Sequence, residues 1–131
     1  MKKKSIKTLK LKLDKIFSEY IRRRVADKFG NCTCCTCGKV LPWKEIHNGH
    51  FISRGKLSVR FDTRNCHAQC CGCNTFKNGE PQKYWVFMEK KYGREVIEEL
   101  MMLSNQIIKL TPTWYEENIA YYKDIVAGYK D

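Results

Sequence analysis

The chain has 131 residues, 43% of them hydrophobic, which is enough for one compact domain with a real core. No apolar run is long enough to span a membrane. Twenty-five lysines and arginines stand against 14 acidic residues, and the resulting formal net charge of +11 favours a polyanionic partner, nucleic acid ahead of an acidic membrane surface. We expect residues 1–131 to form a single domain with three zones.

The first zone, residues 5–29, has the apolar spacing of a helix with one buried face. Lysines and arginines fill the other positions, and Gly30 and Asn31 are predicted to end the helix. We expect it to pack as a scaffold, while its basic face either contacts phosphates or is merely solvated. The apolar positions are Leu9, Leu11, Leu13, Ile16, Phe17, Tyr20, Ile21 and Val25.

Eight cysteines in a chain of this size indicate either a disulfide framework or a metal site. The N-terminus has a charged start but no apolar segment or small-residue cleavage site, so no secretory signal is predicted and a cytoplasmic location is expected. Disulfides are disfavoured in that reducing compartment, and Cys-x-x-Cys pairs therefore indicate zinc.

The second zone, residues 32–80, contains two such pairs. Each can form a knuckle whose backbone amides point at the thiolates, and Gly38 and Gly72 suit tight turns of this kind. Two pairs supply four soft ligands, the closed tetrahedral set of a structural zinc. The pairs are Cys34 with Cys37 and Cys70 with Cys73.

The other four cysteines allow two interpretations. They are either small buried side chains and reduced thiols, or the ligands of a second metal ion. A content of one zinc per chain would exclude the second interpretation. The four residues are Cys32, Cys35, Cys66 and Cys71.

The third zone, residues 81–131, returns to a helical pattern. Pro81 suits the first turn of a helix, Gly93 is predicted to break the pattern into two helices, and Thr111 and Pro112 are predicted to open a last helix. The aromatic residues of these helices are expected in the core rather than on a base-stacking surface.

Between the two cysteine pairs the sequence carries residues suited to phosphodiester hydrolysis. That reaction needs a base that activates water, a divalent ion that stabilises charge on the phosphate, and residues that hold both. His50, at the end of a predicted hairpin strand, is the candidate base, and Asn65 is placed to orient it. Asn74, at the start of the next helix, is a candidate ligand for Mg²⁺ or Mn²⁺ through its amide oxygen.

The order of these motifs resembles the HNH superfamily of ββα-metal nucleases. Within it, the chain resembles the phage NinG (Rap) family of recombination endonucleases, which are implicated in cleaving branched recombination intermediates. The layout is also similar to that of phage endonuclease VII, a Holliday-junction resolvase with a four-cysteine zinc between the same elements. The resemblance covers roughly residues 32–100 and rests on Gly49-His50-Phe51-Ile52-Ser53, Arg64-Asn65, Gln69-Cys70, Cys73-Asn74 and Lys77.

The resemblance implies an α+β fold that is mainly helical, in which a small zinc-stapled ββα-metal (HNH) core is flanked by N- and C-terminal helices. It implies a DNA endonuclease that acts in the host-cell cytoplasm on branched DNA such as Holliday junctions, and a homodimer could cut the opposed strands of a junction. His50 matches the general base, Asn65 the central asparagine and Asn74 the ligand of the catalytic ion. Cys34, Cys37, Cys70 and Cys73 match the structural zinc ligands.

One position departs from the superfamily pattern. Many HNH enzymes place an acidic metal ligand immediately before the base, where this chain has Gly49. The nearest candidates are His47, Asn48 and, further along, Asp62. His47 is either a solvated hairpin residue or a ligand that would favour Mn²⁺, Ni²⁺ or Co²⁺ over Mg²⁺. Asp62 is expected to cap a turn or to pair with an arginine.

Basic residues gather around His50 and are expected to contact phosphates. His67 is open to three roles: orienting a cysteine knuckle, binding phosphate or helping at the metal. A non-catalytic zinc protein that binds nucleic acid would explain the charge and the cysteines equally well, but it would not explain the motif spacing. The candidate phosphate ligands are Arg54, Lys56, Arg60, Arg64 and Lys77.

Overall fold

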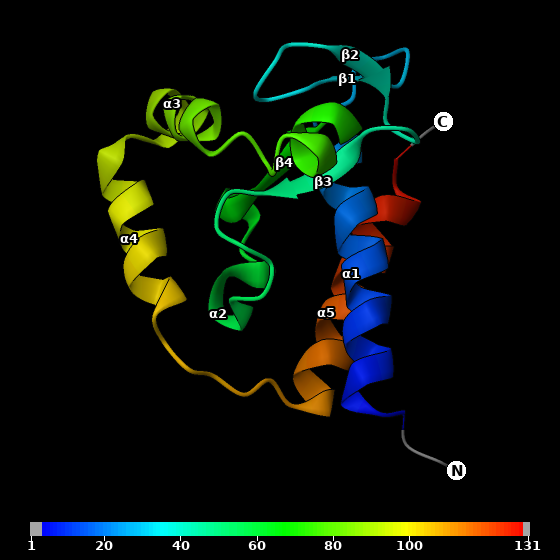
Figure 1. Ribbon diagram of the computed structural model, residues 1–131. Coiled ribbons are helices and arrows are strands. Elements are labelled where there is room, and N and C mark those ends of the chain that lie inside the picture. The colour runs from blue at the N-terminus through cyan, green and yellow to red at the C-terminus, as the bar shows by residue number, and fades with distance from the viewer. Residues whose placement is uncertain (1–3, 130–131) are drawn as a thin grey trace.

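The computed structural model describes residues 4–129, so the two ends of the expected domain, residues 1–3 and 130–131, lie outside the described part (Figure 1). The expected mixture of many helices with a little sheet is confirmed. The elements in chain order are α1 (Ile6–Arg23), β1 (Asn31–Thr33), β2 (Val40–Pro42), β3 (His47–His50), α2 (Leu57–Arg60), the 3-10 turn η1 (Thr63–Asn65), β4 (Cys66–Gln69), the π-helical turn η2 (Gly72–Phe76), α3 (Pro81–Tyr92), α4 (Arg94–Ser104) and α5 (Pro112–Ala127).

Helix α1 buries one residue in every turn. Its buried side chains recur at intervals of four residues, so they form a single stripe along one face. Ser5 caps the start, because its hydroxyl accepts the backbone N–H of Thr8. Leu11 was expected on the buried face, but it is 56% exposed because it lies off this stripe. The buried residues are Leu9, Leu13, Phe17 and Ile21.

The helix ends at Arg23, seven residues before the predicted stop at Gly30. The Asp27 carboxylate accepts the backbone N–H groups of Phe29 and Asn31, which closes the chain into a turn instead. Val25 therefore lies outside the helix and is exposed. Short-range hydrogen bonding by an aspartate outweighed the apolar pattern here.

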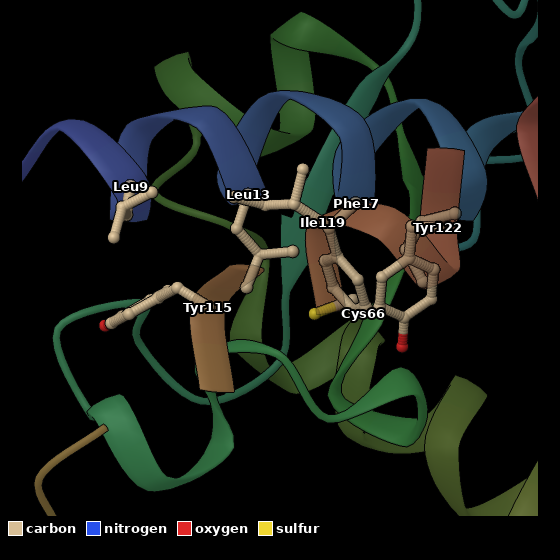
Figure 2. Close-up of a cluster of buried hydrophobic side chains, with 8 residues drawn as sticks. Leu9, Leu13, Phe17, Cys66, Tyr115, Ile119 and Tyr122 are labelled. Atoms are coloured by element: carbon tan, nitrogen blue, oxygen red, sulfur yellow. The ribbon is translucent and has the colours of Figure 1, made fainter. Parts of the chain in front are cut away.

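Helices α1 and α5 lie side by side and share the largest cluster of buried side chains (Figures 1 and 2). The Phe17 ring packs edge-on against Tyr122 of α5, with ring centroids 5.1 Å apart, and against Phe61 at 5.7 Å. The predicted start of α5 is confirmed, since the Thr111 hydroxyl accepts the backbone N–H of Trp114. The first and the last helix of the described chain thereby form one layer.

The sheet structure consists of two separate antiparallel pairs in the described chain. Strands β1 and β2 form a hairpin whose loop carries the first cysteine pair. Strand β3 pairs with β4 so that Gly49 lies opposite His67 and His50 lies opposite Cys66. Residues 51–65 connect β3 to β4 and contain α2 and η1, and β4 runs directly into η2.

Helices α3 and α4 lie on the side of the β3–β4 pair away from α1 (Figure 1). Pro81 occupies the first turn of α3, and Gly93, with φ at +88°, separates α3 from α4, both as predicted. Tyr84 and Met88 of α3 are buried with residues of α2 and α4 in a second core cluster. The aromatic residues of these helices thus pack mainly in the interior.

No helix in the described part of the chain is long and apolar enough to cross a membrane.

Replacing Phe17 with alanine should lower the free energy of unfolding by about 3–5 kcal/mol, because it opens a cavity where α1, α5 and residue 61 meet. Leu11→Ala, on the exposed side of the same helix, should change it by no more than about 0.5 kcal/mol. Urea denaturation of both variants measures the difference. Equal losses in the two variants would contradict the assigned packing face.

Candidate functional site

The four cysteines of the two predicted pairs come together in space. Their Sγ atoms all lie within 4.8 Å of one another. Among residues 4–129, no other group of His, Cys, Asp or Glu side chains is close enough together to hold a metal ion. The Cys37 and Cys70 sulfurs are 3.7 Å apart. Zinc–sulfur bonds of about 2.3 Å in a tetrahedron would set sulfur atoms about 3.8 Å apart. The four thiols could therefore hold one zinc ion.

The two pairs reach this cluster by different local structures. The first forms a turn between β1 and β2, in which the Gly38 N–H donates to the Cys34 carbonyl and Gly38 has φ at +81°. The second was expected to form a glycine knuckle as well. Gly72 instead begins η2 with a helical backbone, and the N–H of Asn74 donates to the Cys70 carbonyl. This helical turn, and not a glycine knuckle, places Cys70 and Cys73 in the cluster.

The environment of Cys34 favours its ionised form. Burial acts to raise its pKa, but the Thr36 hydroxyl and the backbone N–H groups of Cys70, Thr36 and Cys37 outweigh that effect and lower the pKa to about 6. A thiolate is the form that binds zinc.

The remaining four cysteines do not form a second metal cluster in the described chain. Burial raises the pKa of Cys35 to about 12 and also raises the pKa of Cys32 and of Cys66. The Cys32 thiol donates to the Arg22 carbonyl and the Cys66 thiol to the Arg60 carbonyl. Cys32 and Cys66 are thus small buried side chains, whereas Cys35 and Cys71 are half-buried thiols outside any metal cluster of the described residues.

A cleft of about 790 Å³ lies between α1, the segment around β3 and the turn η2. It brings together His50, His47 and Asn74, which the sequence had singled out. The Asn74 side-chain nitrogen Nδ2 is 3.2 Å from Nδ1 of His47, so the two candidate ion ligands are neighbouring side chains.

His50 enters the cleft from the end of β3. Its Nε2 atom lies 3.0 Å from the Arg60 carbonyl oxygen, which can only accept a hydrogen bond. Nε2 must therefore carry the proton, and in the neutral ring Nδ1 is left with a free lone pair. Burial lowers the pKa of His50, and the positive charges of Arg54 and Arg60 lower it further against the opposing charge of Asp14. The lowered pKa favours the neutral form of the ring at pH 7.

Asn65 was expected to orient His50, but its own hydrogen bonds go elsewhere. Its fully buried side chain accepts the N–H of Ile52 at 2.8 Å and donates to the carbonyls of Ile52 and Val59. Asn65 thus ties the two ends of the 52–59 loop together. Its main-chain carbonyl also accepts the N–H of Phe51 at 2.8 Å, so Asn65 holds the backbone next to His50 and makes no hydrogen bond to the ring.

The predicted phosphate ligands differ in how free they are. Arg60 is bound side-on by Asp14, and Arg64 is bound by Asp62 and Glu99. Lys56 and Lys77 are exposed, although neither lines the cleft. Arg54 lines the cleft, is 60% exposed and keeps one longer contact, 3.3 Å to Asp14. Arg54 is therefore the best placed of the five to meet a phosphate in the cleft.

Asp62 has the role expected of it as a capping and ion-pairing residue. Its carboxylate accepts the backbone N–H of Arg64 and pairs with the Arg64 guanidinium. Hydrogen bonds from Arg64 hold the pKa of Asp62 below its usual range against the effect of burial. It does not line the cleft and does not replace the missing acid at position 49.

Helix α1 also supplies cleft residues that the sequence did not reveal: Asp14, Ser18 and Arg22, joined by Lys44 and Glu45 before β3. The only available signal was the position of Asp14, a lone acid among the lysines of the first turns. Without the packing of α1 on β3 and β4, nothing connects that acid to His50.

Gly49 is required by close packing, which explains why no acid stands before His50. A Cβ built on Gly49 would lie 2.2 Å from Oε1 and 2.7 Å from Cβ of Gln69. Gln69 is fully buried and donates through Nε2 to Thr36 and to the Gly79 carbonyl, so it has no room to withdraw.

His67 takes none of the three roles left open for it. The Tyr84 hydroxyl donates to the Gly49 carbonyl at 2.7 Å, so its oxygen accepts from Nδ1 of His67, and Nε2 of His67 accepts from Tyr92. Burial, with the charges of Arg24 and Lys91, lowers the pKa of His67 to about 3. The neutral, buried His67 ring thus joins β4 to α3 through its hydrogen bond to Tyr84.

Comparison with known proteins identifies the family of this chain. The family described as Bacteriophage Lambda NinG protein matches residues 1–130. The chain belongs to the NinG family. Protein ninG of Escherichia phage 933W is 33% identical over 82 residues, and the proteins ninG of Escherichia phage lambda and Salmonella phage P22 are 32% identical over 82 residues.

The match to these NinG relatives covers 62% of this chain and 38% of each of those proteins. The chain thus spans well under half the length of the curated relatives. No solved structure shows significant similarity to it.

The NinG-family cluster should bind one zinc per chain, and Cys73→Ser should remove that zinc because it deletes one of four ligands. Elemental analysis of purified protein measures the metal content. Cys71→Ser is the matched control, since Cys71 lies between Cys70 and Cys73 in the sequence but outside the cluster, and it should retain one zinc. Two zinc ions per wild-type chain would contradict the single site.

Gly49→Ala should lower the free energy of unfolding by about 1–3 kcal/mol, because the methyl group collides with the buried Gln69 side chain. Gly55→Ala serves as the control, since its Cβ would meet only the Ser53 hydroxyl at 3.5 Å. Thermal and urea unfolding report both effects. A Gly49→Ala protein as stable as wild type would contradict the close-packing explanation.

Proposed function

We propose that this NinG-family protein is a metal-dependent endonuclease of the HNH type that hydrolyses DNA phosphodiesters, with branched DNA such as Holliday junctions as its substrate. The observation that carries the proposal is His50, a neutral imidazole with its Nε2 proton fixed on a carbonyl, in a cleft that also contains Asn74 and His47. The resemblance of the motif order to HNH nucleases supports the same reading.

His50 has the features of a general base. Its free Nδ1 lone pair can take a proton from water, and its lowered pKa keeps that lone pair available at neutral pH. The fixed Nε2 proton restricts the ring to one tautomer and orientation. Water activated in this way would attack a phosphorus atom placed in the cleft.

The residues beside His50 are compatible with a divalent cation. Asn74 offers an amide oxygen and His47 an imidazole nitrogen from adjacent positions in the cleft. An imidazole in the donor set suits Mn²⁺, Ni²⁺ or Co²⁺ better than Mg²⁺. When bound, such an ion would stabilise charge on the phosphate and the leaving oxygen.

The four-cysteine cluster supports the HNH interpretation through its position. Asn74 follows Cys73 directly in η2, and β3 with His50 pairs with β4, which leads into the same turn. Zinc on the cysteines would fix the base and the ion ligands relative to each other, as the endonuclease VII-like layout implies. This zinc is structural in the proposed mechanism and takes no part in hydrolysis.

DNA is the binding partner that the positive net charge of the chain favours. The net charge of +11 and the exposed basic residues at the cleft, Arg54 and Lys44 among them, favour contacts to the phosphate backbone. Selectivity for branched DNA is the part of the proposal that depends on family resemblance. Cleavage of matched linear, nicked, flapped and four-way substrates tests it.

His50→Ala should lower the rate of DNA cleavage in Mn²⁺ by a factor of about 10²–10⁴, because the general base is lost, while DNA affinity stays close to that of wild type. Single-turnover cleavage and fluorescence anisotropy measure the two quantities. Wild-type activity should persist below pH 6.5, since the pKa of His50 is lowered and its neutral form survives there.

Wild-type protein in EDTA is the control for the divalent ion. Full cleavage by His50→Ala would refute the base assignment. Binding without cleavage by wild type, with Mn²⁺ and on every substrate, would favour the alternative function of a non-catalytic zinc protein that binds nucleic acid.

A further inference from the structure

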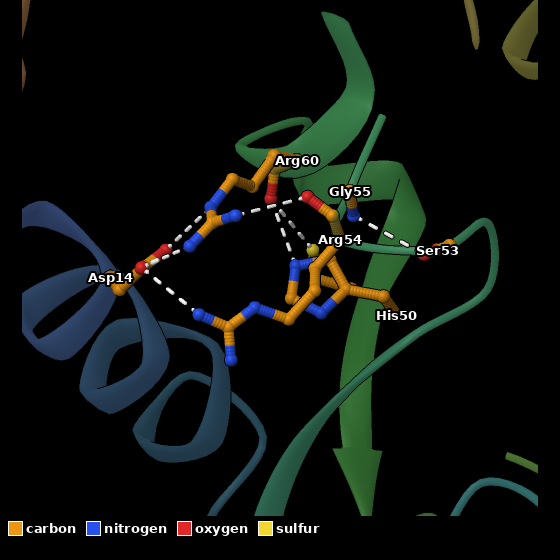
Figure 3. Close-up of polar contacts among 7 residues, drawn as sticks. Asp14, His50, Ser53, Arg54, Gly55 and Arg60 are labelled. Carbon is orange, nitrogen blue, oxygen red and sulfur yellow. Dashed lines mark hydrogen bonds and ion pairs between the residues drawn. The ribbon is translucent and has the colours of Figure 1, made fainter. Parts of the chain in front are cut away.

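Asp14 connects the N-terminal helix to the residues around His50 (Figure 3). Its carboxylate accepts from Nε of Arg60 at 2.9 Å and forms a second, closer ion pair with the Nη2 atom of the same guanidinium. The Arg60 side chain is only 11% exposed. This is a two-point, charge-assisted contact that fixes the guanidinium in one orientation.

Arg60 in turn acts on His50 through its main chain. The Arg60 carbonyl oxygen accepts from Nε2 of His50, and the Arg60 guanidinium donates to the Arg54 carbonyl at 3.1 Å. Figure 3 shows this chain of contacts from Asp14 through Arg60 to the imidazole ring. Arg60 therefore contacts both the Nε2 atom of His50 and the main chain of the loop beside it.

The segment that carries Arg60 has little support of its own. Helix α2 has only four residues, and Lys56 at its start makes no capping hydrogen bond through its side chain. Tethers from outside the segment must therefore hold it. Asn65 holds the Val59 carbonyl, and Ser58 donates to the Leu103 carbonyl of α4. The Cys66 thiol donates to the Arg60 carbonyl, and Asp14 holds the Arg60 side chain.

We propose that Asp14 is a positioning residue for the proposed cleavage reaction: by fixing Arg60 it keeps the Arg60 carbonyl where it orients His50 as the base. This inference rests on the proposed function for its catalytic meaning. It also reassigns Arg60, predicted from the sequence as a phosphate ligand, to the support of His50. Helix α1 becomes part of the active site rather than a separate scaffold.

Asp14 also contacts Arg54, but less firmly. That contact is a single 3.3 Å ion pair to a guanidinium that is 60% exposed. A phosphate entering the cleft can take Arg54 from Asp14 while Arg60 stays bound. Removal of the Asp14 charge should therefore tighten DNA binding slightly while it slows the reaction, which separates positioning from binding.

The test compares Asp14→Ala with Glu19→Ala. Glu19 lies on the same helix, pairs with Arg23 and is similarly exposed, 28% against 22% for Asp14, but it does not line the cleft. Alanine is the best helix former, so both variants should keep α1. Circular dichroism and thermal unfolding check this.

Nitrogen-15 NMR of the imidazole rings at pH 8 reads the tautomer of His50 without any need for activity. The chain has three histidines, which keeps assignment simple. Wild type and Glu19→Ala should show His50 as the Nε2–H tautomer alone, whereas Asp14→Ala should show a mixture. An unchanged single tautomer in Asp14→Ala would overturn the proposal.

Single-turnover cleavage at saturating DNA gives the second readout. Asp14→Ala should lower the rate about 10–100-fold with no loss of DNA affinity, whereas Glu19→Ala should match wild type. In a His50→Ala background, Asp14→Ala should cause no further loss. An additive loss there, or an equal loss in Glu19→Ala, would overturn the proposal. Absence of cleavage by wild type would refute the proposed function, and the NMR result would still decide whether Asp14 positions His50.

Discussion

The meeting of four thiols from two distant parts of the chain is the constraint on which the site depends. Cys34 and Cys37 lie in the β1–β2 turn, and Cys70 and Cys73 lie where β4 becomes η2. A metal ion bound by them would contribute folding free energy directly. Because Asn74 follows Cys73 and His47 pairs with Gln69 across the β3–β4 pair, the cluster determines whether these side chains face one cleft.

Close packing behind the cleft limits the chemistry that can appear in it. Gln69 occupies the space that a side chain at position 49 would need, and His67 with Tyr84 holds the Gly49 carbonyl from the other side. An acid at that position cannot be accommodated without rebuilding this part of the interior. The remaining candidate ligands, His47 and Asn74, offer an imidazole and an amide instead of a carboxylate, which changes which cation the cleft would prefer.

The arginines show how poorly net charge alone describes a binding surface. Arg60 and Arg64 count fully toward the charge of +11, yet each is held by a carboxylate of the same chain. Arg54 is exposed at the cleft and keeps only one longer contact, to Asp14. Net charge favours a polyanionic partner. Ion pairing within the fold decides which arginine side chains are available to contact such a partner.

Features that depend on local interactions could be predicted from the sequence. Thr111, Pro81 and Gly93 mark helix ends correctly because capping and backbone conformation involve only a few neighbouring residues. The two Cys-x-x-Cys pairs predicted the cluster because tetrahedral coordination demands four such ligands. The sequence predicted too long a first helix, because the apolar pattern carries no information about the Asp27 turn.

Only the tertiary structure decided which residues surround His50. The pairing of Asp14 with Arg60 spans 46 positions in the sequence, and no periodicity or motif connects the two. Asn65 was assigned to the histidine by motif, but its hydrogen bonds go to the loop, since a buried amide binds the nearest unpaired backbone groups. Sequence determined the residue types and the local elements, while the packing of elements far apart in the chain determined their partners, because those contacts exist only in the complete fold.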